Sequence, residues 1–180
     1  MKAIGAAAAS ALAVLASGCS GGDSKPPQIK NNGTCTFSGA GSTQGARPCT
    51  VAGAFTTSER VGVIEVSYNT AADYDGGVVV GETLYGTITF PAAPVPGTYA
   101  SSNSSAFVPA STQIQLVNAS TGGDWAASTG QGSFTLVLTS VSMLGTDPEI
   151  GAVYLPKGTL DATLVPITSA TGNVRVQATF

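Results

Sequence analysis

The chain has 180 residues, a length that suits one globular domain and at most two. It is 43% hydrophobic but only 9% charged, so it can build a core while its polar surface has to consist mainly of Ser, Thr, Gly and Asn. Lys and Arg number 7 against 10 Asp and Glu, which leaves no basic surface for nucleic acid. The chain contains no histidine, and this excludes a Ser-His-Asp triad, a Cys-His pair and an imidazole metal site. We therefore expect no cofactor.

The N-terminal segment is organised like a bacterial secretory signal. Lys2 supplies a positive charge, Ala3 to Ala16 form an apolar run, and small residues lead up to Cys19. The run is shorter than the 20 or so apolar residues that a membrane-spanning helix needs. Leu15-Ala16-Ser17-Gly18-Cys19 resembles the lipobox of bacterial lipoproteins. The resemblance implies that residues 1–18 are a signal peptide and that Cys19 is lipidated and becomes the new N-terminus.

A lipidated Cys19 implies a place in the cell envelope. Each buried CH₂ of an acyl chain contributes about 0.8 kcal/mol, so the several chains of such an anchor hold a protein stably on a membrane. Ser20 follows the cysteine, and the family resemblance makes the outer membrane the expected location rather than the inner one. The alternative is an ordinary cleaved signal peptide, with Cys19 as an incidental thiol.

A tether is expected between the anchor and the folded domain. Residues 19–33 are rich in Gly, Pro and Asn and have almost no large apolar side chain, so they cannot bury enough surface to fold alone. We therefore divide the chain into a signal peptide (1–18), a tether (19–33) and a single domain (34–180).

The two cysteines of the domain, Cys35 and Cys49, are expected to form a disulfide. They are the even number that remains after Cys19 is set aside, and the envelope is an oxidising compartment. Closing a loop of this size stabilises a fold by about 3 kcal/mol in the chain-entropy model. Two free thiols or a two-cysteine metal site are the alternatives, and the metal is disfavoured because no histidine or further cysteine could complete its coordination.

From Thr34 onward, apolar residues recur with a period of two, as in strands. The clearest case is the C-terminal segment, in which Val174, Val176, Ala178 and Phe180 alternate with polar residues. Further strands are predicted at 51–56, 60–68, 78–80, 83–90, 113–118, 134–139 and 159–164, with turns that include 75–77, 145–148 and 156–158. Many short strands without intervening helices predict an all-β fold, an antiparallel β-sandwich of the jelly-roll or Ig-like kind with about eight or nine strands.

An alternative architecture is an eight-stranded outer-membrane barrel. The terminal Phe180, which follows alternating apolar residues, resembles the closing strand of such barrels, and the length fits. Against this alternative, aromatic residues make up only 7% of the chain, and Pro91, Pro94, Pro96 and Pro109 interrupt the candidate spans. The composition therefore favours the sandwich.

Two candidate ligand sites emerge from the sequence. Asp73 and Asp75 lie next to Gly76 and Gly77 and could bind calcium through carboxylate oxygens, although an Asp-Gly hairpin turn is the simpler interpretation. Trp125 is the only tryptophan. On an exposed rim its ring could stack on a sugar, but in the core it would fill space between the sheets, and we favour the core.

Neither the acidic residues nor the threonines select an activity. Glycoside hydrolysis needs a facing pair of carboxylates, and no spacing among the available acids selects one. These acids are Asp73, Asp75, Glu82, Asp124, Asp147, Glu149 and Asp161. Threonines dominate the outward strand positions, which could present a hydroxyl ladder to a polysaccharide, although threonine is also simply a good strand former. These outward residues are Thr83, Thr87, Thr89, Thr135, Thr139, Thr159, Thr163 and Thr179.

The sequence therefore predicts a lipid-anchored envelope protein that is not an enzyme. Its expected role is structural or binding, with the membrane, and a protein or polysaccharide of the envelope, as partners. A carbohydrate-binding or calcium-assisted adhesive module is the first alternative, and a small glycoside hydrolase is the second.

Overall fold

The computed structural model describes residues 29–39, 44–56, 58–69, 74–75, 78–79, 81–118, 122–168 and 170–180. These residues are nearly all antiparallel β structure, with two short 3₁₀ turns, η2 (Ser104–Ala106) and η3 (Pro109–Ser111). Across the described ranges, no helix is long and apolar enough to span a membrane.

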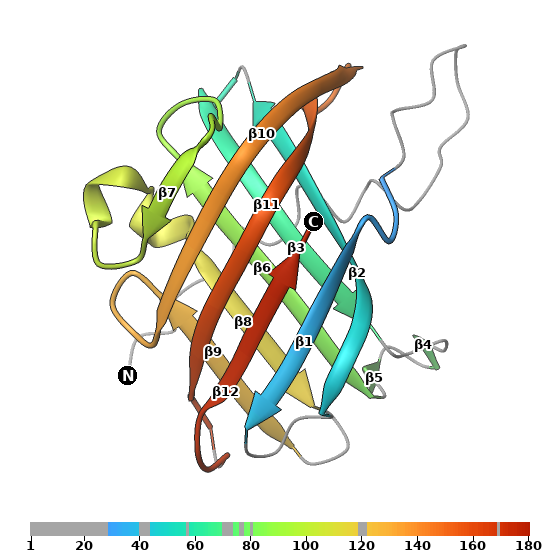
Figure 1. Ribbon diagram of the computed structural model, residues 1–180, viewed down its shortest axis with the longest axis vertical. Helices are drawn as coiled ribbons and strands as arrows, with labels where there is room; N and C mark the ends of the chain where they lie inside the picture. Colours follow the sequence, from blue (N-terminus) through green and yellow to red (C-terminus); the bar gives the residue numbers. More distant parts are fainter. Residues whose placement is uncertain are drawn as a thin grey trace.

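The described residues contain twelve strands, and ten of them form one sheet (Figure 1). The sheet strands, in chain order, are β1 (Gly33–Gly39), β2 (Gly45–Thr56), β3 (Val61–Asn69), β6 (Glu82–Phe90), β7 (Gly97–Ala100), β8 (Gln113–Asn118), β9 (Gly123–Ser128), β10 (Ser133–Asp147), β11 (Gly151–Pro166) and β12 (Val174–Thr179). The remaining two, β4 (Tyr74–Asp75) and β5 (Val78–Val79), form a separate small hairpin.

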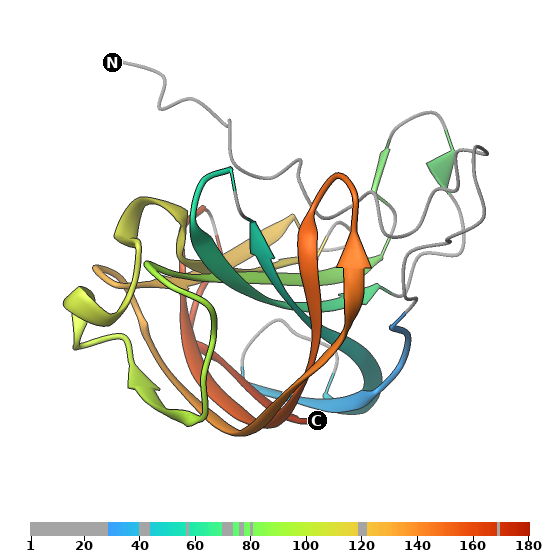
Figure 2. The same ribbon diagram turned by 90° about the horizontal axis from the view of Figure 1, so that it is seen from above.

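The sheet folds over into two layers. Strands β1, β12, β11, β10 and β7 form the front layer of Figure 1, and β2, β3, β6, β8 and β9 lie behind them, as the view from above confirms (Figure 2). Strand β11 also pairs with β2 and β9, so the two layers are joined along both sides. Five pairings join strands that are consecutive in the chain, namely β1–β2, β2–β3, β8–β9, β10–β11 and β11–β12. The other six, such as β6–β8 and β7–β10, join non-consecutive strands, so the topology combines hairpins with crossovers.

The predicted alternation separates core from surface. In β12, Val174, Val176 and Ala178 are buried, whereas Arg175, Gln177 and Thr179 between them are exposed. Both layers contribute large apolar side chains to one core, each worth about 1.5 to 3 kcal/mol on burial. Its largest fully buried members include Trp125, Phe37, Ile64, Leu84, Ile88, Ile114, Leu116, Leu136, Leu160 and Leu164. The all-β, sandwich-like fold is thus confirmed.

The disulfide between Cys35 and Cys49 is also confirmed. It joins β1 to β2, its Cα atoms are 5.8 Å apart, and both cysteines are fully buried in the core. The bond therefore links the front layer to the back layer next to the N-terminal edge of the domain.

The predicted turn at 156–158 is wrong, because these residues lie inside β11. Gly158 pairs with Leu138 of β10 at a point where the register of β10 shifts. A Cβ at Gly158 would lie 1.8 Å from the carbonyl oxygen of Val137, so glycine is needed here for the close approach of two strands. From the sequence alone, a Pro-Lys-Gly segment in a turn cannot be distinguished from one inside a strand.

The turn predicted at 145–148 lies slightly later in the chain. Strand β10 continues to Asp147, and the turn covers residues 148–150. The buried Asp147 closes it, because its Oδ1 accepts hydrogen bonds from the backbone N–H groups of Glu149 at 2.8 Å and Ile150 at 2.9 Å. This carboxylate therefore has a structural role.

Candidate functional site

Outward side chains of the front layer form three regular rows, and we call these three rows the front face. The register of β1, β12, β11, β10 and β7 places outward residues directly opposite one another across the strands. Three rows result: Thr34, Thr179, Thr159, Val137 and Thr98; Thr36, Gln177, Asp161, Thr135 and Ala100; and Ser38, Arg175, Thr163 and Ser133. Neighbours within a row lie about 4.8 Å apart, and successive rows about 6.7 Å apart.

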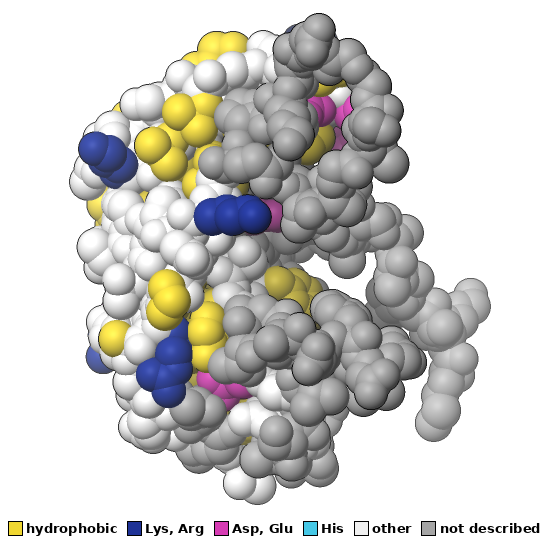
Figure 3. Space-filling model, turned by 90° about the vertical axis from the view of Figure 1, so that its right-hand side faces the viewer, with side chains coloured by type: hydrophobic (Ala, Val, Ile, Leu, Met, Phe, Trp, Pro, Cys, Tyr) yellow, Lys and Arg dark blue, Asp and Glu magenta, His cyan; other side chains and the backbone are white. Residues whose placement is uncertain are grey.

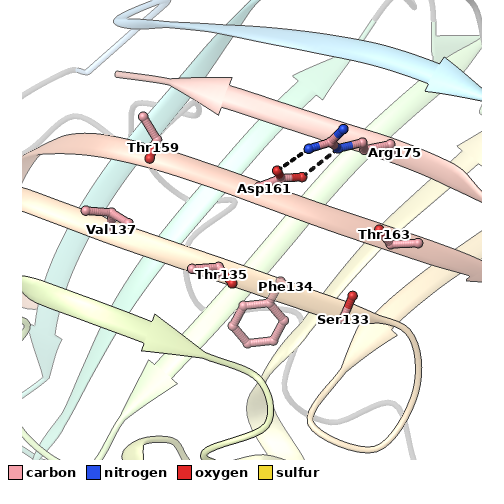
Figure 4. A pocket seen from close by; sticks show the side chains of 8 residues that line it. All are labelled: Ser133, Phe134, Thr135, Val137, Thr159, Asp161, Thr163 and Arg175. Atoms are coloured by element: carbon pink, nitrogen blue, oxygen red, sulfur yellow. Dashed lines mark hydrogen bonds and ion pairs between the residues drawn. The ribbon is translucent and has the colours of Figure 1, made fainter.

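A shallow depression of about 590 Å³ lies on the front face (Figure 4). Its walls are mostly hydroxyl-bearing, with one acid and one base among them. The lining residues are Ser133, Phe134, Thr135, Val137, Thr159, Asp161, Thr163 and Arg175. Phe134 is itself buried in the core, so the accessible side chains of the depression are predominantly polar.

Asp161 and Arg175 form an ion pair within the depression, and their side chains point toward one another in Figure 4. Arg175 donates from Nε to Oδ1 at 2.9 Å and from Nη2 to Oδ2 at 2.6 Å. Gln177 adds a longer bond to Oδ2 at 3.4 Å. The hydrogen bonds from Arg175 lower the pKa of Asp161, so both groups stay charged at neutral pH and compensate each other.

The pair still has hydrogen-bonding capacity for a ligand. A guanidinium has five N–H donors, of which Asp161 takes two, so three remain. The pair is half exposed, with 54% of the Arg175 side chain and 43% of the Asp161 side chain accessible, and water screens the attraction between exposed charges. Its geometry is therefore better suited to contacts at the surface than to holding the sheet together.

Charged side chains are also few among the described residues on the side of the molecule shown in Figure 3. In the side view of Figure 3, basic and acidic side chains appear as isolated spots among uncharged atoms. No three Asp, Glu, His or Cys residues gather into a metal site in the part of the chain that the structure describes.

Trp125 lies in the core and not on a binding surface. Its side chain is only 2% exposed, and its indole Nε1 donates to the carbonyl oxygen of Gly172 at 3.0 Å. The ring packs so closely on Gly123 that a Cβ there would lie 2.2 Å from it. Trp125 therefore offers no face to a sugar, and the favoured core interpretation is correct.

The other sequence candidates are placed only in part. Cys19 and Asp73 lie outside the described residues. Asp75 lies in β4 and pairs with Val78 of β5, and residues 76–77 of the predicted turn lie outside the described residues. The acid considered for hydrolysis on β9, Asp124, accepts hydrogen bonds from Gln115, and Glu82 on β6 accepts one from Asn118.

Glu65 is an unexpected titratable group on the outward side of the back layer. It lies on β3, between Ala52 of β2 and Thr87 of β6. Burial raises its pKa from 4.5 to about 7, because a carboxylate removed from water binds its proton more tightly. Sequence reasoning missed this group, because its burial depends on what packs around β3.

Glu65 should make stability fall as the pH rises. The folded protein keeps the proton up to about pH 7 and the unfolded chain loses it near 4.5, so folding is weakened across that interval by up to about 3 kcal/mol. Glu65→Gln should remove this contribution and be the more stable protein at about pH 8. Urea unfolding of both proteins at about pH 5 and about pH 8 measures it, and parallel pH profiles would show that the carboxyl titrates normally.

Comparisons of this chain with protein-family models, with curated proteins and with solved structures found no match.

Proposed function

We propose that this chain is a lipid-anchored, non-catalytic binding protein of the bacterial cell envelope, most simply of its outer membrane. Its front face holds an uncharged, hydroxyl-rich polymer, a polysaccharide. The observation that carries this proposal is the alignment of Thr, Ser and Gln side chains in three rows across the front layer, with one internally compensated ion pair among them.

The shape of the front face favours a polymer over a small molecule. Small-molecule sites are usually concave and largely apolar, and they enclose most of the ligand. The front face is instead open, polar and several strands wide, with only a shallow depression. Such a surface makes many weak hydrogen bonds along an extended partner, and strands held by a packed core present them with little loss of entropy.

The charge of the front face favours an uncharged partner. The only cation within its three rows, Arg175, is already paired with Asp161. Lys157 is exposed on β11 one position beyond the rows, and the whole chain has a net charge of −3. Within the three rows an anionic polymer would meet no unpaired positive charge, while hydroxyl groups find both donors and acceptors.

The lipobox at Cys19 supports the anchoring part of the proposal. Residues 20–32 separate this cysteine from β1, which starts at Gly33. Fully extended, a spacer of that length reaches at most roughly 45 Å, enough to bring the front face to polymers near the membrane. A fatty-acid label that enters the protein and is lost in Cys19→Ala would establish the anchor.

Removing two hydroxyls from the depression should weaken polymer binding. We expect the full-length protein to co-sediment with at least one of insoluble cellulose, chitin or peptidoglycan. Thr135→Val with Thr163→Val should then lower the affinity about fivefold or more, because two hydrogen bonds of about 0.5 to 1.5 kcal/mol each are lost without a change in side-chain shape. Thr146→Val, at an exposed position near the end of β10, is the matched control and should bind normally.

Salt separates this mode of binding from an electrostatic one. Because the front face is neutral, the bound fraction should hardly change between roughly 0.05 and 0.5 M NaCl. Failure of all three polymers to retain the protein, or equal binding by the double variant, would contradict the proposed function. A steep loss of binding with salt would contradict its uncharged ligand.

A further inference from the structure

We propose a second binding site, for a single uncharged sugar ring, on the outward side of the back layer. It is formed by Tyr85, Gln113, Gln115 and Asp124, which we call the Tyr85 cluster. These residues come from β6, β8 and β9, and the front face lies on the opposite layer (Figures 1 and 2). The site rests on its own contacts and does not depend on the proposed function.

The ring of Tyr85 leans over the sheet and keeps an accessible side. Tyr85 on β6 lies directly opposite Gln115 on β8, and its hydroxyl donates a hydrogen bond to Gln115 Oε1. A ring tied to the facing residue of the next strand lies across the pair rather than projecting away from the sheet. It is nevertheless 42% exposed, which leaves aromatic surface for a ligand.

Polar groups beside the ring are held in fixed positions. Gln115 donates from Nε2 to both carboxylate oxygens of Asp124, at 2.8 and 3.0 Å. Gln113 donates from Nε2 to Gln115 Oε1 at 3.2 Å. The chain of hydrogen bonds thus crosses three neighbouring strands, and little side-chain freedom remains to be lost when a ligand binds.

This combination of groups matches the two sides of a sugar. The C–H face of a pyranose packs on an aromatic ring, and its hydroxyls need donors and acceptors near the edge of that ring. Asp124 can still accept, because a carboxylate has about four acceptor positions and Gln115 occupies two of them. Tyr85 keeps its proton, since burial and the charge of Asp124 both raise the pKa of the phenol.

The charge of the cluster selects against acidic sugars. The carboxylate of Asp124 is hydrogen-bonded to an amide and not to a cation, so the site has negative character. A neutral sugar donates hydroxyl hydrogens to it, whereas a uronic acid is repelled. Because the front face lies on the other layer, one protein molecule would bind two polysaccharide chains and bridge them.

The test is a titration of the full-length protein with neutral oligosaccharides, followed by backbone amide NMR shifts. The probes are cellohexaose, chitohexaose, xylohexaose and mannohexaose. At least one should shift the amides of Tyr85, Gln115 and Asp124. Tyr85→Ala should weaken that binding about tenfold or more, as the loss of an aromatic anchor does, while Tyr85→Phe keeps the ring and should stay within about threefold.

Two further variants keep the result interpretable. Asp124→Ala leaves the ring in place and should weaken binding several-fold, and Val95→Ala, at a position 57% exposed outside the cluster, should change nothing. No shift at the cluster with any probe, or equal binding by Tyr85→Ala, would overturn the site. Shifts confined to the front face overturn it while leaving the proposed function intact. Shifts confined to the cluster support it and contradict the proposed function.

Discussion

Trp125→Ala is expected to lower the free energy of unfolding by about 3 to 5 kcal/mol, the usual cost of deleting a large buried aromatic side chain. The ring is the largest of the fully buried side chains and fills the space beside Gly123. Its removal leaves a cavity, and it also deprives the Gly172 carbonyl of its donor. Urea unfolding followed by far-UV circular dichroism measures the loss.

A conservative replacement at the same position keeps the test informative if the alanine variant does not fold. Trp125→Phe retains an aromatic ring but lacks the indole donor to Gly172, so it should lose less stability than the alanine variant, about 1 to 3 kcal/mol. A loss below about 1 kcal/mol in Trp125→Ala would mean that the side chain is not packed in the core.

Reducing the disulfide is expected to cost about 3 kcal/mol. The bond closes a short loop, with Cys35 and Cys49 separated by 14 residues, and a loop of this size gives about that value in the chain-entropy model. Ten strands with a continuous apolar core remain, so the reduced protein should be destabilised but still folded. Urea unfolding with and without reductant measures the difference.

Cys35→Ala with Cys49→Ala provides the control for this prediction. The double variant should resemble the reduced protein and should not respond to reductant. An unchanged unfolding midpoint in the wild-type protein after complete reduction, with both thiols counted as free, would show that the bond does not stabilise the fold.

Strands with regular alternation could be predicted from the sequence, and strands built of small residues could not. Strand β8 was predicted at its observed bounds, 113–118. Strand β9 was missed, because Gly123–Ser128 has glycine and alanine where the pattern requires large apolar residues. Strands β1 and β7 were missed as well, since they are short and rich in Gly, Thr and Ser. Pairing with neighbours, and not intrinsic preference, makes these segments strands.

The candidate site was predictable in its residues but not in its arrangement. Alternation alone placed Thr135, Thr159, Thr163 and Thr179 on outward faces. Their alignment into rows depends on which strands are neighbours in the sheet, and this order cannot be deduced from one sequence. One predicted outward threonine is covered: Thr89 is only 4% exposed, because its hydroxyl donates to Ser111 O at 2.8 Å beneath the η3 segment.

The ion pair and the Tyr85 cluster also depend on strand pairing that the sequence alone does not reveal. Asp161 and Arg175 meet because β11 and β12 pair in a register that places Asp161 opposite Gln177 and Arg175 one position along the same face. Tyr85 and Gln115 are 30 residues apart in the chain and meet only through the pairing of β6 with β8. Functional surfaces on a sheet combine residues from several strands, so the topology has to be known first.

The most direct test of the account is NMR of the full-length protein with isotope-labelled threonine methyl groups, titrated with the same neutral oligosaccharides. Front-face binding predicts shifts at the methyls of Thr135, Thr159 and Thr163, which line the depression, and little change at Thr89 and Thr112, which are buried under η3. Unchanged methyls at the three depression threonines with every sugar would contradict the account.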